Sequence, residues 1–107
     1  MMLPKVDPVR DRDWLNHLRE QPCILTGQKG SAQETVDPAH IGTLGKSIKS
    51  SDDEALPLLH RYHAEGHQIG EMTMFRRYLP TDVLRAALRA YARELYREWR
   101  AKQARAA

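Results

Sequence analysis

The chain has 107 residues, of which 41% are hydrophobic and 29% are charged, as is typical of one soluble globular domain. No run approaches the roughly 18 apolar residues needed to span a membrane, and the early charges at the N-terminus argue against a secretory signal. The single cysteine, Cys23, excludes an intramolecular disulfide and agrees with a reducing compartment. We therefore expect one cytoplasmic domain, residues 1–107, with no membrane partner. The oligomeric state stays open.

The formal net charge of +3 is unevenly distributed along the chain. Residues 76–105 contain nine basic side chains and three acidic ones, Asp82, Glu94 and Glu98. The basic ones are Arg76, Arg77, Arg85, Arg89, Arg93, Arg97, Arg100, Lys102 and Arg105. A basic segment of this kind permits contact with a polyanion such as DNA but does not require it.

The N-terminal third predicts one helix and two short extended segments. Asp7 and Pro8 suit the N-cap and the first position of a helix that ends before Pro22. Residues 23–30 form a short apolar run broken by two glycines, which predicts a strand or a tight knuckle. Residues 34–41 predict a second short strand, with a bend at its proline.

The rest of the chain predicts a loop followed by three helices. Residues 42–54 are rich in Gly, Ser, Lys and Asp, as loops are. From Ala55 the pattern becomes helical and runs to Gly70, a residue suited to ending a helix. Residues 71–79 predict a short helix that ends at Pro80.

The last predicted helix, residues 81–105, begins with Thr81 as its N-cap and has about six turns. Its apolar side chains recur at helical spacing: Leu84, Leu88, Tyr91, Leu95 and Trp99. Its arginines also follow an i, i+4 row. This row is either a solvated face or a stripe that tracks phosphates.

Three of the five histidines lie within residues 60–67. On a helix with about 100° per residue, His63 and His67 lie about 40° apart, and His60 lies about 60° from His63. The i, i+4 pair can chelate one ion, and His60 is a less favoured third ligand. Solvated histidines are the alternative interpretation.

Asp37 and His40 precede this helix and extend the candidate site. If residues 35–41 form a strand beside the helix, His40 could approach an ion held by His63 and His67. A divalent ion and a neutral histidine together suit phosphodiester hydrolysis. A turn-capping role for Asp37 and a hydrogen-bonded turn for His40 are the structural alternatives.

These motifs resemble those of the HNH nucleases, especially the small ones of phages and prophages. The resemblance covers about residues 22–80 and rests on Cys23-x2-Thr26-Gly27, on the Asp-Pro-Ala-His-Ile run at 37–41, and on the Pro-Leu-Leu-x3-His-x3-His-Gln-Ile-Gly run at 57–70. It implies a ββα-metal core, in which a hairpin and a helix surround one divalent ion. The fold class we expect is therefore α+β and mostly helical, with this core between an N-terminal helix and a long amphipathic C-terminal helix.

The resemblance also assigns roles to particular residues. His40 matches the general base, and His63 and His67 match the metal-binding histidines. Asp37 is the best substitute for a further ligand, because Ala39 stands beside the base. Glu54 occupies the position of the family's central asparagine and is the second catalytic candidate. The implied cofactor is one Mg2+ or Mn2+ ion, with Zn2+ or Ni2+ as alternatives.

The chain departs from the family at the structural zinc site that many relatives carry. The four ligand positions read Cys23, Thr26, Leu59 and Tyr62, and one thiolate cannot hold a tetrahedral zinc. We expect apolar packing to replace this site.

The resulting hypothesis is a metal-dependent endonuclease that hydrolyses DNA. Its DNA-binding candidates are Lys46, Lys49, Arg85, Arg89 and Arg93, although a solvated loop explains the two lysines equally well. The alternatives are a catalytically inactive DNA-binding or phage accessory protein with the same fold, and an interaction module with solvated histidines.

Overall fold

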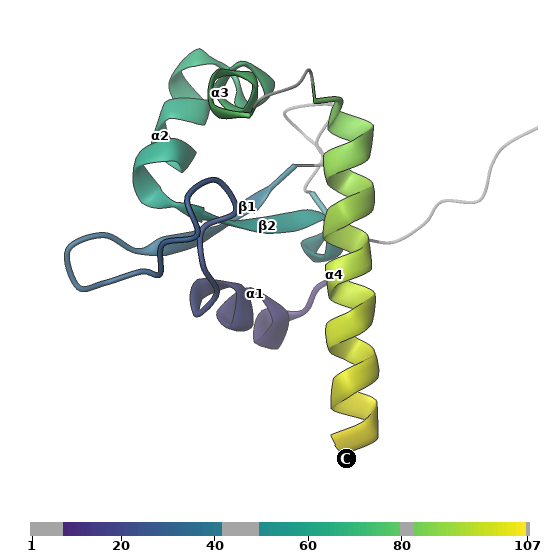
Figure 1. Ribbon diagram of the computed structural model, residues 1–107. Helices are drawn as coiled ribbons and strands as arrows, with labels where there is room; N and C mark the ends of the chain where they lie inside the picture. The colour runs from purple at the N-terminus through teal and green to yellow at the C-terminus, as the bar shows by residue number, and fades with distance from the viewer. Residues whose placement is uncertain (1–7, 42–49, 80–82, 107) are drawn as a thin grey trace, which may run out of the picture.

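The computed structural model describes residues 8–41, 50–79 and 83–106, and Figure 1 shows their arrangement. The elements in chain order are α1 (Arg12–Arg19), β1 (Val36–His40), the 3-10 turn η1 (Asp52–Glu54), β2 (Ala55–Leu59), α2 (His60–Ile69), α3 (Glu71–Tyr78) and α4 (Arg85–Ala106). The fold is α+β and mostly helical, as the sequence predicts. None of the helices in these ranges is both long and apolar enough to cross a membrane.

The two strands pair antiparallel, with Val36 opposite Leu59 and His40 opposite Ala55. Pro38 lies opposite Pro57. Neither proline has an N–H to donate, so this pair can occupy only a position where the two residues exchange no hydrogen bonds. The Pro57 carbonyl points outward instead and accepts the N–H of Ile24 at 2.9 Å. The two prolines therefore fit the strand register.

The prediction that the helix begins at Ala55 is wrong. Residues 55–59 form β2, all five of them buried, and α2 begins only at His60. A short apolar run has the same pattern in a buried strand as in a buried helix. Pairing with β1 decides between them here, since it satisfies the backbone of a segment buried on both sides.

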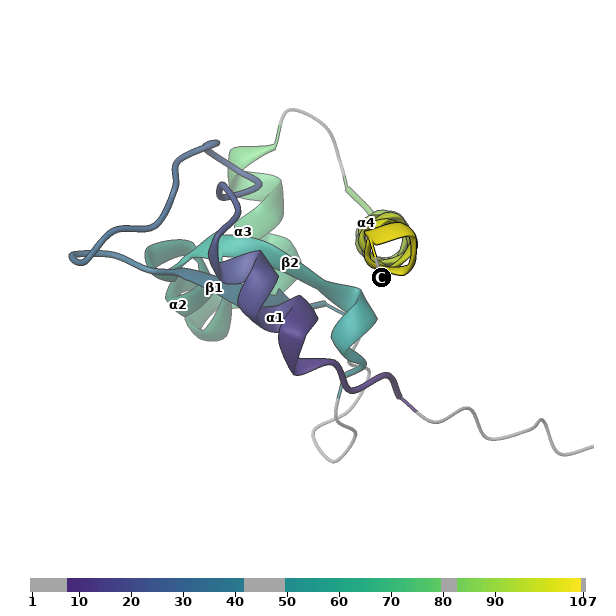
Figure 2. The same ribbon diagram turned by 90° about the horizontal axis from the view of Figure 1, so that it is seen from below.

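The α1 and α2 helices lie on opposite faces of the β1–β2 pair (Figures 1 and 2). In the view from below, α1 crosses in front of the strands and α2 lies behind them. The α4 helix stands beside both layers and runs along the edge of the molecule. This arrangement gives the strands two separate surroundings, one formed with α1 and one formed with α2 and α3.

The core is correspondingly divided between the two faces. The larger cluster joins the strands to α3 and α4 through Leu56, Leu58, Met74, Phe75 and Leu88, among others. The smaller one packs Trp14 and Leu18 of α1 against Ala55, with Tyr96 and Trp99 of α4 closing it. Burial of a large apolar side chain contributes about 1.5–3 kcal/mol, so both faces contribute to holding the strands in place.

The first helix begins later than predicted. Asp7 lies outside the described residues, and the N-cap is Asp11, whose Oδ1 accepts the Trp14 N–H at 3.1 Å. Two residues before this N-cap, the Val9 N–H donates to Ser51 Oγ at 2.8 Å, and the Val9 carbonyl accepts the Asp52 N–H at 2.9 Å. These contacts hold the segment extended up to the N-cap.

Residues 23–30 contain no strand and form the predicted knuckle, with Gly27 at φ 73°. Gly70 separates α2 from α3 at φ 98°, a value that favours glycine, so the predicted helix end is confirmed. The short helix predicted for residues 71–79 is also confirmed as α3.

The C-terminal helix is present, and Leu88, Leu95 and Trp99 pack into the two core clusters as predicted, but Leu84 and Tyr91 do not. Leu84 is 65% exposed and Tyr91 is 50% exposed, whereas Ala92 is fully buried. Tyr96 packs inward because its hydroxyl donates to Asp11 Oδ2 at 2.9 Å. Thr81, the predicted N-cap, lies outside the described residues.

Candidate functional site

The predicted site residues fall into two groups on opposite faces of the strand pair. Asp37 and His40 are three residues apart in β1, and alternate residues of a strand point to opposite faces. Asp37 contacts the histidines of α2, whereas His40 borders a groove with α1. The structure therefore does not bring His40 together with His63 and His67.

The group on the α2 face centres on Asp37. Its Oδ2 lies 2.8 Å from His60 Nδ1 and 3.0 Å from His63 Nδ1. Its Oδ1 accepts the hydroxyl of Thr35 at 2.9 Å. His60, which the helical angles made the less favoured ligand, is thus a direct partner of the carboxylate. One aspartate joins two imidazoles.

The electrostatics of this group favour the ionised carboxylate. Burial raises the pKa of Asp37, but hydrogen bonds from His60 and His63 outweigh it and hold the pKa below its ordinary value. A carboxylate that stays ionised can bind a cation without first losing a proton.

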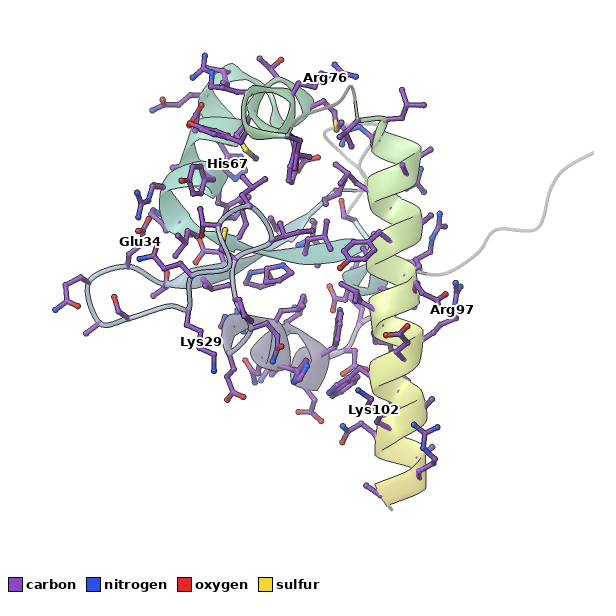
Figure 3. The ribbon with its side chains drawn as sticks, in the orientation of Figure 1. Lys29, Glu34, His67, Arg76, Arg97 and Lys102 are labelled. Carbon is purple, nitrogen blue, oxygen red and sulfur yellow. The ribbon has the colours of Figure 1, made fainter. Side chains whose placement is uncertain are left out.

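His67 lies beside His63 on the same face of α2. Its ring centroid lies 4.8 Å from that of His63, and Figure 3 shows it on α2, on the side of the strands away from α1. A cavity of about 40 Å³ lies between these two histidines, with Glu71 and Leu58 also lining it. Space of this kind holds one water once it reaches roughly 10–15 Å³, so this cavity can hold a single small ligand.

Imidazole and carboxylate groups of the kind gathered on this face are ligands that divalent transition metals accept. Ligand atoms at adjacent corners of an octahedron lie about 3.0 Å apart when each is about 2.1 Å from the ion, close to the two oxygen–nitrogen distances at Asp37. The same distances describe hydrogen bonds in the absence of a metal. Within the described ranges, no three His, Cys, Asp or Glu side chains already form a metal-binding group. Binding would therefore need His67 to turn toward the other donors.

The group on the α1 face centres on His40. Its Nε2 lies 2.9 Å from Asp52 Oδ1, and Asp52 is 6% exposed. The other oxygen of this carboxylate accepts the Asp11 N–H at 2.8 Å, and Arg10 lies 3.6 Å from Oδ1. The Nε2–H of a neutral His40 can donate to Asp52, which leaves Nδ1 free to accept a proton.

Glu54 contacts α4 and not His40. Its carboxylate accepts two hydrogen bonds from Arg89, at 2.8 and 3.2 Å, and lies 3.9 Å from Arg93. Its backbone carbonyl accepts the Ile41 N–H at 2.9 Å, just beyond the end of β1. The acid that reaches His40 is Asp52, two residues earlier.

The candidate DNA-binding arginines of α4 are held in intramolecular contacts. Arg85 donates to Glu71 and to the Ile41 carbonyl, both at 2.6 Å. Arg89 and Arg93 both form ion pairs with Glu54. The other two candidates, Lys46 and Lys49, lie outside the described residues.

Apolar packing occupies three of the four positions that the sequence resemblance aligns with a structural zinc site. Cys23 and Leu59 are buried in the larger core cluster, and Tyr62 packs against it. The Tyr62 ring also meets that of Tyr78 edge-on, with centroids 4.9 Å apart. Thr26 is exposed.

Sequence reasoning missed Asp52 and undervalued His60. Asp52 belongs to a run of three consecutive acids, and nothing in the run distinguishes the one that would face His40. His60 could have been found, because residues at i and i+3 share a helix face.

Comparison with protein-family models, with curated protein sequences and with solved structures found no match to this chain.

Proposed function

We propose that the protein is a metal-dependent endonuclease of the HNH type that hydrolyses phosphodiester bonds in DNA. The observation that carries the proposal is the antiparallel strand pair followed directly by α2, with Asp37 of β1 within 3.0 Å of His63 and the His67 ring beside it. This order of elements and ligands is what the sequence resemblance implies. A DNA substrate agrees with the cytoplasmic location expected from the sequence.

In this proposal Asp37, His63 and His67 hold one divalent ion, and His60 is a further donor. Imidazole nitrogens suit Mn2+, Ni2+ and Zn2+ better than Mg2+, which prefers oxygen ligands. When bound, the ion supplies Lewis-acid stabilisation of the charge that develops on the phosphate and the leaving oxygen.

The role of His40 is to take a proton from the attacking water. Asp52 fixes the ring through Nε2 and leaves Nδ1 as the acceptor. A hydrogen bond from the other ring nitrogen to a carboxylate also stabilises the imidazolium that forms. His40 is about one-third exposed, so water can reach the ring.

The second candidate is a DNA-binding protein that keeps this fold and does not cleave. The observation that favours it is the separation of His40 from the Asp37 group by the strand pair. A base and a metal that act on one phosphate must both reach it, and here they begin on opposite faces.

Incubation of supercoiled plasmid with the protein and each of Mg2+, Mn2+, Ni2+ and Zn2+ tests the proposal. We expect nicked or linear product with at least one transition metal, and none with EDTA. His63→Ala should lose this activity. His17→Gln is the matched control, because His17 lies against Trp14 and Trp99, away from both groups. Absence of cleavage with every metal would leave the DNA-binding candidate.

A further inference from the structure

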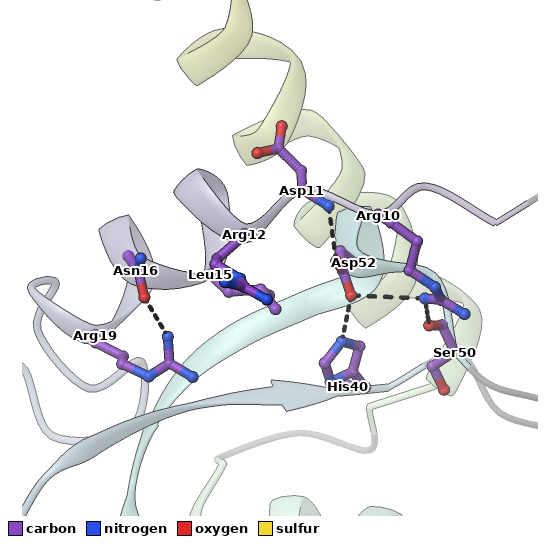
Figure 4. Close-up of a pocket in the computed structure, with 9 residues that line it drawn as sticks. All are labelled: Arg10, Asp11, Arg12, Leu15, Asn16, Arg19, His40, Ser50 and Asp52. Carbon is purple, nitrogen blue, oxygen red and sulfur yellow. Dashed lines mark hydrogen bonds and ion pairs between the residues drawn. The ribbon is translucent and has the colours of Figure 1, made fainter.

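An open groove of about 1020 Å³ borders the exposed side of α1 and the end of β1 (Figure 4). It is separate from the Asp37 group, which faces α2. The polar side chains that line it include Arg10, Arg12, Asn16, Arg19, His40 and Asp52. Three guanidinium groups therefore border the same space as the candidate base.

The two carboxylates of this groove are engaged by other partners. Asp52 accepts from the Asp11 N–H and lies 2.9 Å from His40. Asp11 caps α1 through the Trp14 N–H and also accepts the Tyr96 hydroxyl. Neither acid forms an ion pair with Arg12 or Arg19, so they do not neutralise the positive charge along α1.

Arg12 and Arg19 are both exposed, and each is available to an external anion. Within the described part of the chain, Arg12 has no hydrogen-bond or ion-pair partner, and Arg19 donates only to the neutral side chain of Asn16, at 2.6 Å. The arginines of α4 differ, as Arg85 and Arg89 each pair with a carboxylate at 2.6–2.8 Å. Charge that is already paired has less to gain from a phosphate.

We propose that this groove binds the phosphate backbone of a DNA strand, with Arg12 and Arg19 contacting phosphates and His40 facing the bound strand. The choice of DNA rests on the proposed function, whereas the location and the anionic chemistry rest on the groove itself. A guanidinium can donate two parallel hydrogen bonds to one phosphate.

The spacing of the two arginines suits an extended polyanion. Seven residues make nearly two helical turns, so Arg12 and Arg19 project from almost the same side of α1 and lie about 10.5 Å apart along its axis. Figure 4 draws both side chains on α1 among the residues that line the groove with His40 and Asp52. At this separation the two guanidiniums meet different phosphates of one strand and not a single small anion.

The test is DNA binding in EDTA, where no cleavage occurs, measured by fluorescence anisotropy of a labelled 20-base-pair duplex over a range of salt concentrations. For duplex DNA, each lost phosphate contact flattens the slope of log K against log salt by about 0.9. Arg12→Gln/Arg19→Gln should therefore flatten the slope by about 1.8 and weaken binding by about tenfold or more near 0.1 M salt.

The matched control is Arg76→Gln/Arg105→Gln, which removes the same charge from two exposed arginines that do not line the groove. Figure 3 shows Arg76 at the end of the molecule opposite α1. The control should keep the wild-type salt slope. Equal weakening by the two double variants would overturn the proposal, as would wild-type affinity in the groove variant.

Three further measurements complete the test. Arg12→Lys/Arg19→Lys keeps the charge and should retain the wild-type salt slope, and circular dichroism checks that each variant is folded. Poly-glutamate should compete poorly with the duplex, and equal competition would make the groove a general site for acidic polymers. A protein that binds DNA through the groove but never cleaves it supports this inference and contradicts the nuclease. If Arg12→Gln/Arg19→Gln cleaves DNA at the wild-type rate, the result supports the nuclease and contradicts DNA binding in the groove.

Discussion

The two faces of the β1–β2 pair place histidines in different settings. On the α2 face, the Asp37 carboxylate contacts two imidazoles, those of His60 and His63. The ring of His67 lies beside that of His63. On the α1 face, the Asp52 carboxylate contacts a single imidazole, that of His40. It also accepts the N–H of Asp11, the N-cap of α1.

The difference separates two kinds of chemistry. Several imidazoles around one carboxylate form a set of donors that can converge on a cation. A single imidazole fixed by a buried carboxylate has a defined tautomer and one free nitrogen, as a general base requires. The variants below should therefore affect either ion binding or proton transfer, according to the face they alter.

Of the variants that leave metal binding intact, His40→Ala should have the largest effect on activity. Loss of a general base lowers the rate by about 10²–10⁴-fold, while the affinity for the metal should not change, because His40 does not face Asp37. Single-turnover cleavage at saturating metal measures the rate. Wild-type cleavage by His40→Ala would remove the role assigned to the α1 face.

Asp52→Asn should lower the same rate by about ten- to a hundredfold. Hydrogen bonds to charged groups contribute about 1.5–3 kcal/mol, and the amide cannot stabilise an imidazolium as a carboxylate does. Single-turnover cleavage at saturating metal measures this rate as well. Glu54→Gln is the matched control, since Glu54 contacts Arg89 and not His40. A rate reduced equally by both changes would contradict the distinct role of Asp52.

His60→Ala should weaken metal binding by about tenfold and leave cleavage at saturating metal close to wild type. Partners that orient a metal ligand typically contribute about 10–100-fold to affinity or activity, and His60 is the more exposed of the two imidazoles on Asp37. Calorimetric titration with Mn2+ measures the change. An unchanged affinity for Mn2+ would show that His60 does not contribute to metal binding.

Tyr96→Phe should have the smallest effect, on the stability of the α1 face. Burial and the hydrogen bond to Asp11 raise the pKa of Tyr96 to about 12, above the value of about 10 in an unfolded chain. The folded state thus holds its proton more tightly, so this contribution is complete below pH 10 and is lost as the pH rises toward 12. We expect a loss of about 1–2 kcal/mol at neutral pH.

Urea unfolding at pH 7 and at several values from 9 to 12 measures that effect. The free energies of unfolding of the wild type and Tyr96→Phe should converge as the pH rises. A difference that stays constant up to pH 12 would contradict the raised pKa.

Local patterns predicted the α2 face well. The i, i+4 spacing placed His63 and His67 together, and the glycine at position 70 marked the end of their helix. Both features depend only on neighbours within a few residues, which a single sequence specifies.

Contacts between distant segments were harder to predict. Pairing with β1 makes residues 55–59 a strand, and no periodicity in five apolar residues reveals it. Asp52 meets His40 across twelve residues, through a connection that the sequence describes only as a loop.

The placement of His40 and Asp37 on opposite faces could have been predicted from the sequence. A three-residue spacing within a strand always gives opposite faces. The prediction that His40 would approach the ion treated the strand as near the helix without following its alternation.

Calorimetric titration with Mn2+ of the wild type, His63→Ala and His40→Ala tests the central claim most directly, which is that the ion binds on the α2 face, away from His40. One ion per chain should bind to the wild type and to His40→Ala with the same affinity, and His63→Ala should lose it. Binding that weakens equally in both variants, or that no variant alters, would contradict the division between the two faces.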